Sequence, residues 1–267
     1  MNRLKLNEPA RRNLKKALLL IVFCLLAASL SSAEVFKIKQ LLPKTRRITA
    51  YDKKEGKFLW QSEIKSEIIA DGKMLYLLEN GTGIYGKDRK YKTWHSDAYY
   101  HLEKERLIPY QAKLVYKDQA GKTVETMERY YYPKEKKVVG KVDDKVKEFE
   151  DKEDLIDEDL LGVALLNYPF EERRDFVFHL LTNEPVIYKM TIKFLGNETL
   201  NVGGKSVDCY KLQMIPDLGA LNIFGAFVPK TYFWYKTSFP HDFVRYEGLE
   251  SGLNTPYIVM EADKVWP

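Results

Sequence analysis

Apolar and polar residues alternate along most of the chain, which is the pattern of strands with one buried face. After Lys57, one face of an extended chain would carry Phe58, Trp60, Ile64 and Ile68, and the other Gln61, Glu63, Lys65 and Glu67. The Asp71-Gly72 pair that follows is a hairpin turn signal. The sequence therefore predicts a long, half-buried strand followed by a hairpin.

The same alternation predicts a series of further strands. They cover Lys73–Leu78, Gln111–Lys117, Lys122–Tyr132, Val186–Leu195, Val207–Met214, Thr231–Lys236, Phe243–Glu247 and Tyr257–Val265. Turn-forming residues separate several of them, for example at 118–121 and 201–204. Strands joined by short turns favour an antiparallel meander over parallel strands linked by helices. The expected fold is mainly β: a curved antiparallel sheet or incomplete β-barrel.

One segment breaks this pattern. Residues 141–159 hold ten acids and four bases, and we expect them to form a solvated, charged connector. They lead into an apolar stretch at Leu160 that predicts a buried helix, capped by Asp154 or Asp157 and ended by Asn167. We expect this one helix to pack on the concave face of the sheet. No register of the acidic run has the spacing of an EF-hand calcium loop.

The amino-terminal residues have the three parts of a secretory signal peptide. A basic stretch at 11–16 precedes an apolar run at 17–30, and the small residues Ser31-Ser32-Ala33 follow. As a helix the run would span roughly 21 Å, which is short for a hydrocarbon layer of about 30 Å. We therefore expect periplasmic localisation through a Sec-type signal cleaved after Ala33, with an uncleaved membrane anchor as the alternative. We expect no transmembrane span in the mature chain.

Removal of this segment changes the charge of the protein. The chain has 43 bases and 38 acids, a formal net charge of +5. Residues 1–33 hold six of the bases and one of the acids, so 37 of each remain and their charges cancel. A neutral chain argues against electrostatic binding of nucleic acid. The expected organisation is a cleavable signal peptide at 1–33, a lead-in at 34–56 and a single β-rich domain at 57–267.

Sequence motifs for catalysis or cofactor binding are missing from the chain. It has no phosphate-binding loop, dinucleotide-binding glycine pattern, Gly-x-Ser-x-Gly elbow or His-Glu-x-x-His helix. His95-Ser96-Asp97 combines the residue types of a catalytic triad, but adjacent residues on a strand point different ways. After Ala33 the only cysteine is Cys209, which we expect to be buried. We therefore expect no enzyme, no cofactor and no metal site, and export without disulfides fits a bacterial periplasm.

One loop differs from an ordinary polar connector. Residues 218–228 contain six large apolar side chains and no charged residue. Exposed apolar loops mark interaction surfaces, and a buried crossover covering the mouth of the barrel is the alternative. The expected ligand or partner surface consists of Leu221, Ile223, Phe224, Phe227, Tyr232 and Trp234, the last two from the aromatic strand that follows.

Several local motifs occur together between about residues 48 and 262. They are Asp71-Gly72-Lys73 with Tyr76, Leu107-Ile108-Pro109-Tyr110, Asp157–Leu166, Tyr188–Ile192 with an expected turn at Leu195–Thr199, and Arg245-Tyr246-Glu247. This combination resembles an exported Gram-negative domain-of-unknown-function family (DUF 3108-like), which implies no catalytic residues. The layout is also similar in architecture to the half-open barrels of periplasmic lipoprotein carriers and receptors, and a shared fold does not imply a shared function.

These features predict an exported, non-enzymatic protein of the cell envelope. A curved sheet with a helix on its concave face provides space for an apolar or lipid-like molecule between the two. The alternative is an envelope scaffold that binds another protein through the apolar loop or a sheet edge. A hydrolase acting on cell-wall or lipid material would need a site that no motif in the sequence supplies.

Overall fold

The computed structural model describes residues 36–39, 44–217, 219, 229–252 and 254–263. All of them belong to one unit, Glu34–Pro267. The strands are β1 (Lys44–Asp52), β2 (Phe58–Ile69), β3 (Met74–Tyr85), β4 (Lys90–Glu103), β5 (Arg106–Lys117), β6 (Thr123–Tyr132), β7 (Lys137–Val142), β8 (Lys145–Glu150), β9 (Leu155–Asp157), β10 (Phe176–Leu181), β11 (Ile187–Val202), β12 (Lys205–Pro216), β13 (Thr231–Lys236), β14 (Phe243–Leu249) and β15 (Tyr257–Ala262). The helix is α2 (Glu158–Leu166).

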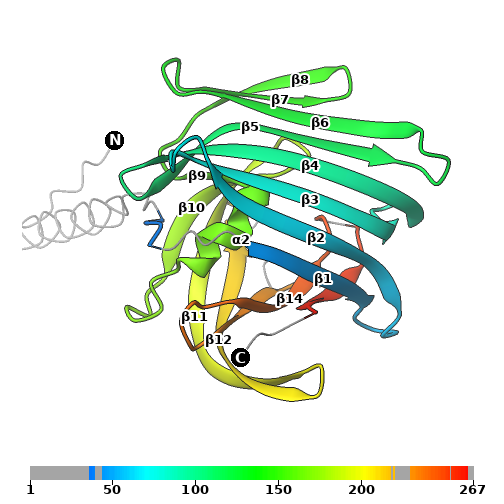
Figure 1. The fold of residues 1–267 in the computed structure, drawn as a ribbon, viewed down its shortest axis with the longest axis vertical. Coiled ribbons are helices and arrows are strands. Elements are labelled where there is room, and N and C mark those ends of the chain that lie inside the picture. The colour runs from blue at the N-terminus through cyan, green and yellow to red at the C-terminus, as the bar shows by residue number, and fades with distance from the viewer. Residues whose placement is uncertain (1–35, 40–43, 218, 220–228, 253, 264–267) are drawn as a thin grey trace, which may run out of the picture. The chain divides into compact units, whose positions relative to one another are not determined.

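Neighbouring strands of the sheet are also neighbours in the chain almost throughout. Their order in space is β8-β7-β6-β5-β4-β3-β2-β1-β15-β14-β13-β12-β11-β10-β9. The pairing of β1 with β15 joins the two halves of the meander, and β9 with β10 is the one parallel pair among the described strands. The predicted fold is confirmed: a single curved, open sheet that makes an incomplete barrel (Figure 1).

The two edge strands, β8 and β9, follow each other in the chain but are not paired with each other in the described sheet. Side chains from the two ends of the sheet meet here, because Tyr131 and Val138 pack in one buried cluster with Leu155 and Leu181. The absent side chain of Gly140 permits this approach, since a Cβ there would lie 2.5 Å from Cβ of the proline at position 185. Packing rather than strand pairing therefore joins the two edges.

Helix α2 lies inside the curve of the sheet (Figure 1). Asp157 caps it by accepting a hydrogen bond from the backbone N–H of Leu160 at 2.9 Å, and Asn167 ends it. Five of its nine residues are buried, in a core that includes side chains from both halves of the sheet. The predicted helix on the concave face is confirmed, with Asp157 and not Asp154 as its cap.

The charged run at 141–159 is not the solvated connector that the sequence predicted. It contributes to the β7–β8 hairpin and then to β9. Strand β8 does keep its charged side chains in water, which protects a sheet edge from pairing with other chains. Asp154 and Asp157, however, are buried, because the fold supplies hydrogen-bond donors for both carboxylates.

The sheet begins earlier than the sequence predicted. The expected lead-in at 34–56 contains β1, which pairs with both β2 and β15. A bulge at Leu59 also changes the face on which Phe58 was expected. Ala50 pairs with Trp60 and Tyr51 pairs with Phe58, so Leu59 is the extra residue of β2. Phe58 is therefore turned outward, with 53% of its surface exposed.

Strands β11 and β12 form a longer hairpin than the alternation predicted. The segment Leu195–Thr199, which was expected to be a turn, continues β11 through a bulge between Phe194 and Gly196. Gly196 has a φ of 121°, a backbone conformation that favours glycine. The turn itself lies between Val202 and Lys205.

Candidate functional site

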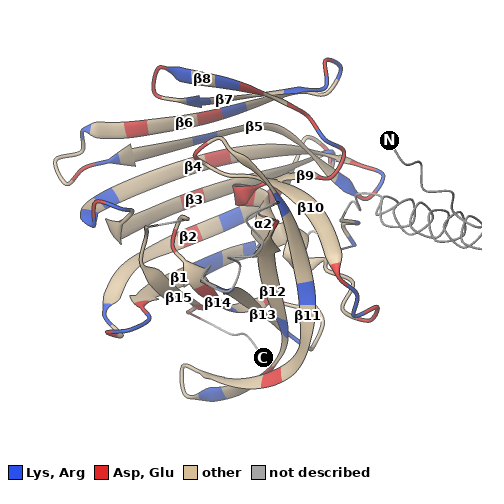
Figure 2. Cartoon of the chain, turned by 180° about the vertical axis from the view of Figure 1, so that it is seen from behind, with Lys and Arg blue, Asp and Glu red and all other residues tan. Residues whose placement is uncertain are grey.

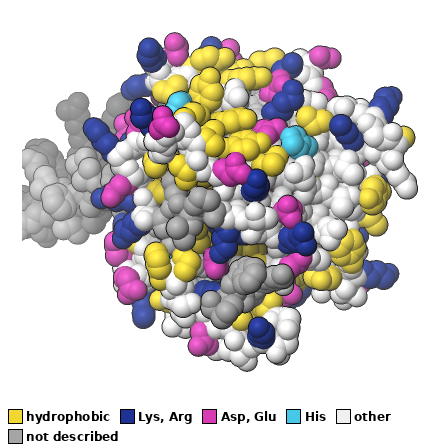
Figure 3. All heavy atoms as spheres, in the orientation of Figure 1, with side chains coloured by type: hydrophobic (Ala, Val, Ile, Leu, Met, Phe, Trp, Pro, Cys, Tyr) yellow, Lys and Arg dark blue, Asp and Glu magenta, His cyan; other side chains and the backbone are white. Residues whose placement is uncertain are grey.

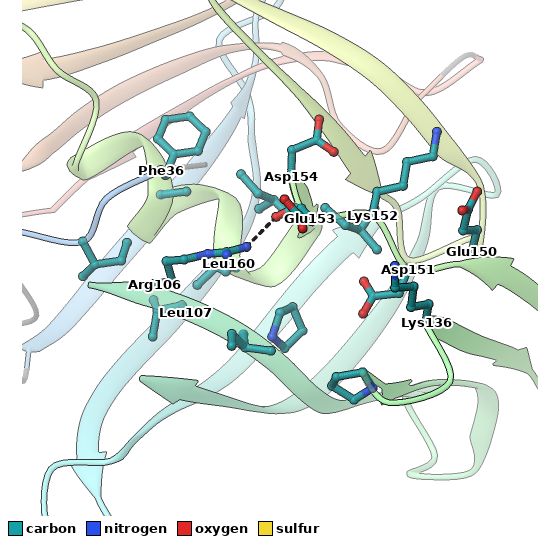
Figure 4. Close-up of a pocket in the computed structure, with 17 residues that line it drawn as sticks. Phe36, Arg106, Leu107, Lys136, Glu150, Asp151, Lys152, Glu153, Asp154 and Leu160 are labelled. Carbon is teal, nitrogen blue, oxygen red and sulfur yellow. Dashed lines mark hydrogen bonds between the residues drawn. The ribbon is translucent and has the colours of Figure 1, made fainter. Parts of the chain in front are cut away.

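A cavity of about 410 Å³ opens beside the start of α2 (Figure 4). This volume lies within the range of about 300–1,000 Å³ that is common for ligand sites. Ten of its lining residues are apolar: Phe36, Ile38, Leu107, Ile108, Pro109, Pro133, Leu155, Ile156, Leu160 and Ala164. The other seven are charged: Arg106, Lys136, Glu150, Asp151, Lys152, Glu153 and Asp154.

Part of the apolar wall comes from residues 36–39, which precede β1. The ring of Phe36 stacks on that of Phe176 with their centres 4.0 Å apart. The backbone N–H of Ile38 donates to the carbonyl oxygen of Glu105 at 2.6 Å. Both apolar side chains are buried, so this short extended segment is a fixed part of the cavity wall.

Charged side chains line the rest of the cavity (Figure 4). Arg106, the first residue of β5, donates from Nη2 to the backbone carbonyl oxygen of Glu153 at 2.9 Å. Its Nε is buried and has no hydrogen-bond partner among the described residues. Burial raises the pKa of Asp151, and the charge of Arg106 acts in the opposite direction. A cation and a carboxyl group thus adjoin the apolar wall.

Asp154 and His179 form a hydrogen-bonded pair beside this cavity. His179 Nδ1 lies 2.8 Å from Asp154 Oδ2, and His179 Nε2 lies 3.1 Å from Lys152 Nζ. Such a carboxylate orients an imidazole, as in catalytic triads. Among the residues that line the described cavity, however, there is no serine, threonine or cysteine, so the pair has no hydroxyl or thiol nucleophile there.

A buried polar network holds the start of α2. Asp157 is only 1% exposed, and its Oδ1 accepts the hydroxyl of Tyr100 at 2.7 Å while its Oδ2 accepts that of Tyr131 at 3.1 Å. Burial raises the pKa of both tyrosines well above the usual value, and the charge of Asp157 adds to this effect. Both hydroxyls therefore remain donors to the carboxylate.

Arg129 of β6 is the buried cation of this network. It is 3% exposed, pairs with Asp159, and donates from Nη1 to Asn183 Oδ1 at 2.8 Å. Burial by itself lowers the pKa of Arg129, but the carboxylates of Asp159 and Asp157 outweigh burial and raise it. The side chain of Glu158 accepts the backbone N–H of Asn183 at 2.8 Å. The acidic start of α2 (red in Figure 2) is thereby attached to β6 and to the β10–β11 connection.

The residues predicted to form a ligand surface are only partly described. Leu221, Ile223, Phe224 and Phe227 lie outside the described residues. Tyr232 and Trp234 alternate with Phe233 and Tyr235, which belong to the main core, and so lie on the opposite face of β13. Neither lines the cavity beside α2. The ammonium group of Lys211 lies 4.9 Å from the ring centre of Trp234 and 5.1 Å from that of Tyr232.

The structure also shows why His95-Ser96-Asp97 is not a triad. His95 and Asp97 share a face of β4 and their side chains lie 2.8 Å apart, whereas Ser96 is buried on the other face. Cys209 is buried as predicted. Burial raises the pKa of its thiol to about 12, so the protonated, unreactive form prevails.

Two features of the sequence are consistent with the buried network. Arg129 stands between Met127 and Tyr131 in the alternation of its strand, which places it on the buried face. Acidic residues at the start of α2 are favoured by the helix dipole. Their presence in the sequence therefore does not by itself indicate a buried cation that pairs with them. The cavity itself had no local signal, because separate segments of the chain supply its walls.

Charged side chains of both signs are mixed on the face of the molecule that Figure 3 draws. On the face drawn in Figure 3, lysine and arginine alternate with aspartate and glutamate, and hydrophobic side chains lie between them. Of the helical residues that the structure describes, none belong to a stretch long and apolar enough to cross a bilayer.

These features define an open β-barrel protein with an internal helix and a cavity of mixed polarity beside it. The chain belongs to the family described as "Protein of unknown function (DUF3108)", which matches residues 83–247. A search of curated proteins found no match.

Two solved structures are similar to this chain. The β-barrel-like protein of domain of unknown function DUF1849 from Brucella abortus is similar with a TM-score of 0.54 at 6% identity, over 84% of this chain and 96% of that one. The hypothetical lipoprotein YmcC from Escherichia coli has a TM-score of 0.30 at 11% identity, over 85% of this chain and 86% of that one. The likeness to the Brucella protein shows a shared fold and no more.

Proposed function

We propose that this protein is an exported, non-enzymatic protein of the cell envelope that holds an apolar or amphipathic molecule in the cavity beside α2. The observation that carries the proposal is the cavity itself: about 410 Å³, with ten apolar and seven charged lining residues. Ligand pockets in proteins combine a mostly apolar wall with a few polar groups that orient the ligand.

The proposed location follows from the amino-terminal segment. A basic stretch, an apolar run and Ser31-Ser32-Ala33 have the order of a signal peptide. We expect the mature protein to begin at Glu34 and to reside in the periplasm. Amino-terminal sequencing of exported protein tests this, and recovery of chains that retain Met1 in the inner membrane would show an anchor instead.

Native mass spectrometry of protein purified from its own periplasm tests ligand binding. The expected result is a bound lipid-like species that is released on unfolding. Leu107→Trp places a larger side chain in the cavity at a half-buried position and should abolish the bound species. Val115→Trp is the matched control, because Val115 lies on the same strand, is also half-buried, and does not line the cavity.

Retention of the bound species in both variants would place it elsewhere on the protein. Wild-type protein that is purified from the periplasm without any bound lipid-like species would contradict the proposal. That outcome would favour the alternative, an envelope scaffold that binds another protein through the apolar loop at 218–228 or through a sheet edge.

A further inference from the structure

We infer that the molecule held in the cavity is an amphiphile with an anionic head group, a carboxylate or a phosphate, that binds the guanidinium group of Arg106. This inference rests on the proposed function and adds the chemistry of the ligand's head. Three features of the cavity support it: the unused donors of Arg106, the state of the neighbouring carboxyl groups, and the apolar wall beside them.

Arg106 has hydrogen-bonding capacity that the described residues do not use. A guanidinium group carries five N–H donors in a planar fork. Among the described residues, Arg106 makes one hydrogen bond, from Nη2 to the carbonyl oxygen of Glu153 at 2.9 Å. Its Nε is buried and unpaired there, which is an unfavourable state for a polar group. A carboxylate or phosphate accepts two N–H groups of such a fork at once.

The nitrogen atoms of Arg106 differ in their access to a ligand. Because Nε is closed off from water, a head group meets the Nη groups first. The two Nη groups belong to the same planar fork, and together they can donate to the two oxygens of a carboxylate or phosphate. Figure 4 shows the side chain of Arg106 extended across the cavity toward Glu153.

The carboxyl groups around the cavity leave the charge of Arg106 available. Asp154 is already hydrogen-bonded to a histidine, and the exposed side chains of Glu150 and Glu153 are screened by water and salt. Burial raises the pKa of Asp151, against the opposing effect of Arg106. The burial of Asp151 therefore disfavours the negative charge that would otherwise neutralise Arg106.

The apolar wall provides for the rest of the ligand. Phe36, Ile38, Leu160 and Ala164 all line the cavity and are all buried. Two further cations, Lys136 and Lys152, line the same cavity. A head group at Arg106 would thus have two further cations in the same cavity besides its four acidic residues. Its acyl chain would be directed along the wall formed by α2 and the 36–39 segment.

Isothermal titration calorimetry with three probes of one chain length tests this inference. The probes are dodecanoate, dodecyl phosphate and dodecanol, titrated into wild-type protein, Arg106→Gln and Lys104→Gln. Lys104 is an exposed residue that does not line the cavity, so its variant controls for the loss of one positive charge. We expect Arg106→Gln to weaken binding of the carboxylate or the phosphate at least tenfold. Its affinity for dodecanol should stay the same, and Lys104→Gln should bind all three probes as tightly as the wild-type protein does. The anionic probe whose affinity falls more in Arg106→Gln identifies the head group.

Two other results would overturn the inference, in distinguishable ways. If all three probes bind and Arg106→Gln changes none of them, the head group does not contact Arg106, and the proposed function stands. If none of the probes binds wild-type protein, the proposed function fails as well. If thermal melting shows that Arg106→Gln is unfolded, Arg106→Lys takes its place. This variant keeps the positive charge but loses the planar fork of donors. The inference then requires the same loss of affinity for the anionic probes.

Discussion

Tyr100 of β4 donates its hydroxyl hydrogen to Asp157 Oδ1 over 2.7 Å, and the same oxygen accepts the backbone N–H of Leu160 at 2.9 Å. One carboxylate oxygen therefore joins the first half of the sheet to the first turn of α2. Leu160 and Ala164 of this helix line the cavity. The position of that part of the wall thus depends on a polar contact buried beneath it.

The first prediction concerns this contact. Asp157→Ala removes the helix cap and leaves the buried hydroxyls of Tyr100 and Tyr131 without their acceptor. We expect the free energy of unfolding to fall by about 3 kcal/mol, the sum of a lost cap and of unsatisfied buried groups. Urea denaturation measures this. Asp144→Ala, at an exposed position of the β7–β8 turn, should change little, and equal losses in both variants would contradict the role of Asp157.

The second prediction concerns the ion pair between Arg129 and Asp159. Arg129→Met leaves buried carboxylates without their cation, and we expect a loss of about 3–5 kcal/mol in the free energy of unfolding. The double variant Arg129→Met with Asp159→Asn removes one of those carboxylate charges and should recover part of the loss. Denaturation of the two single variants and the double variant completes the cycle. Strictly additive losses would show that the two side chains are not coupled.

The third prediction concerns pH. Burial raises the pKa of Glu158, so the folded state binds its proton more tightly than the unfolded state does. Between the unfolded value of about 4.3 and the raised folded value, the contribution of Glu158 to stability falls as the pH rises. Glu158→Gln removes this dependence and should stabilise the protein more at about pH 8 than at about pH 5. Thermal melts of both proteins across this range measure the difference, and parallel curves would refute the assignment.

The fourth prediction concerns the thiol of Cys209. Its pKa is raised to about 12 by burial, so the native protein that begins at Glu34 should not react with a thiol reagent at about pH 8. The same protein should react fully in denaturant. Lys145→Cys, on the exposed edge strand β8, is the positive control. Rapid reaction of native protein without this substitution would show that Cys209 is accessible.

Local patterns were sufficient to predict the class of fold. Alternation with a period of two identifies strands because successive side chains point to opposite faces, and hairpin signals such as Asp71-Gly72 explain why neighbouring strands pair. The helix was predictable for the same reason, since Asp157 and Asn167 act on backbone groups within a few residues of themselves. Bulges such as that at Leu59 were not predictable, because an extra residue is defined only against the partner strand.

The sequence by itself thus determined an antiparallel series of hairpins and one buried helix, because strands, hairpins and helix caps arise from contacts between near neighbours in the chain. Only the tertiary structure decided which buried charges pair with each other. Arg129 and Asp159 are 30 positions apart, and nothing local distinguishes Asp157 from an exposed acid. The cavity has the same origin, since Phe36, Arg106 and Leu160 are brought together only when the sheet curls around α2. Contacts between distant segments depend on that closure, and a periodic pattern of apolar residues carries no information about which polar side chains will meet inside it.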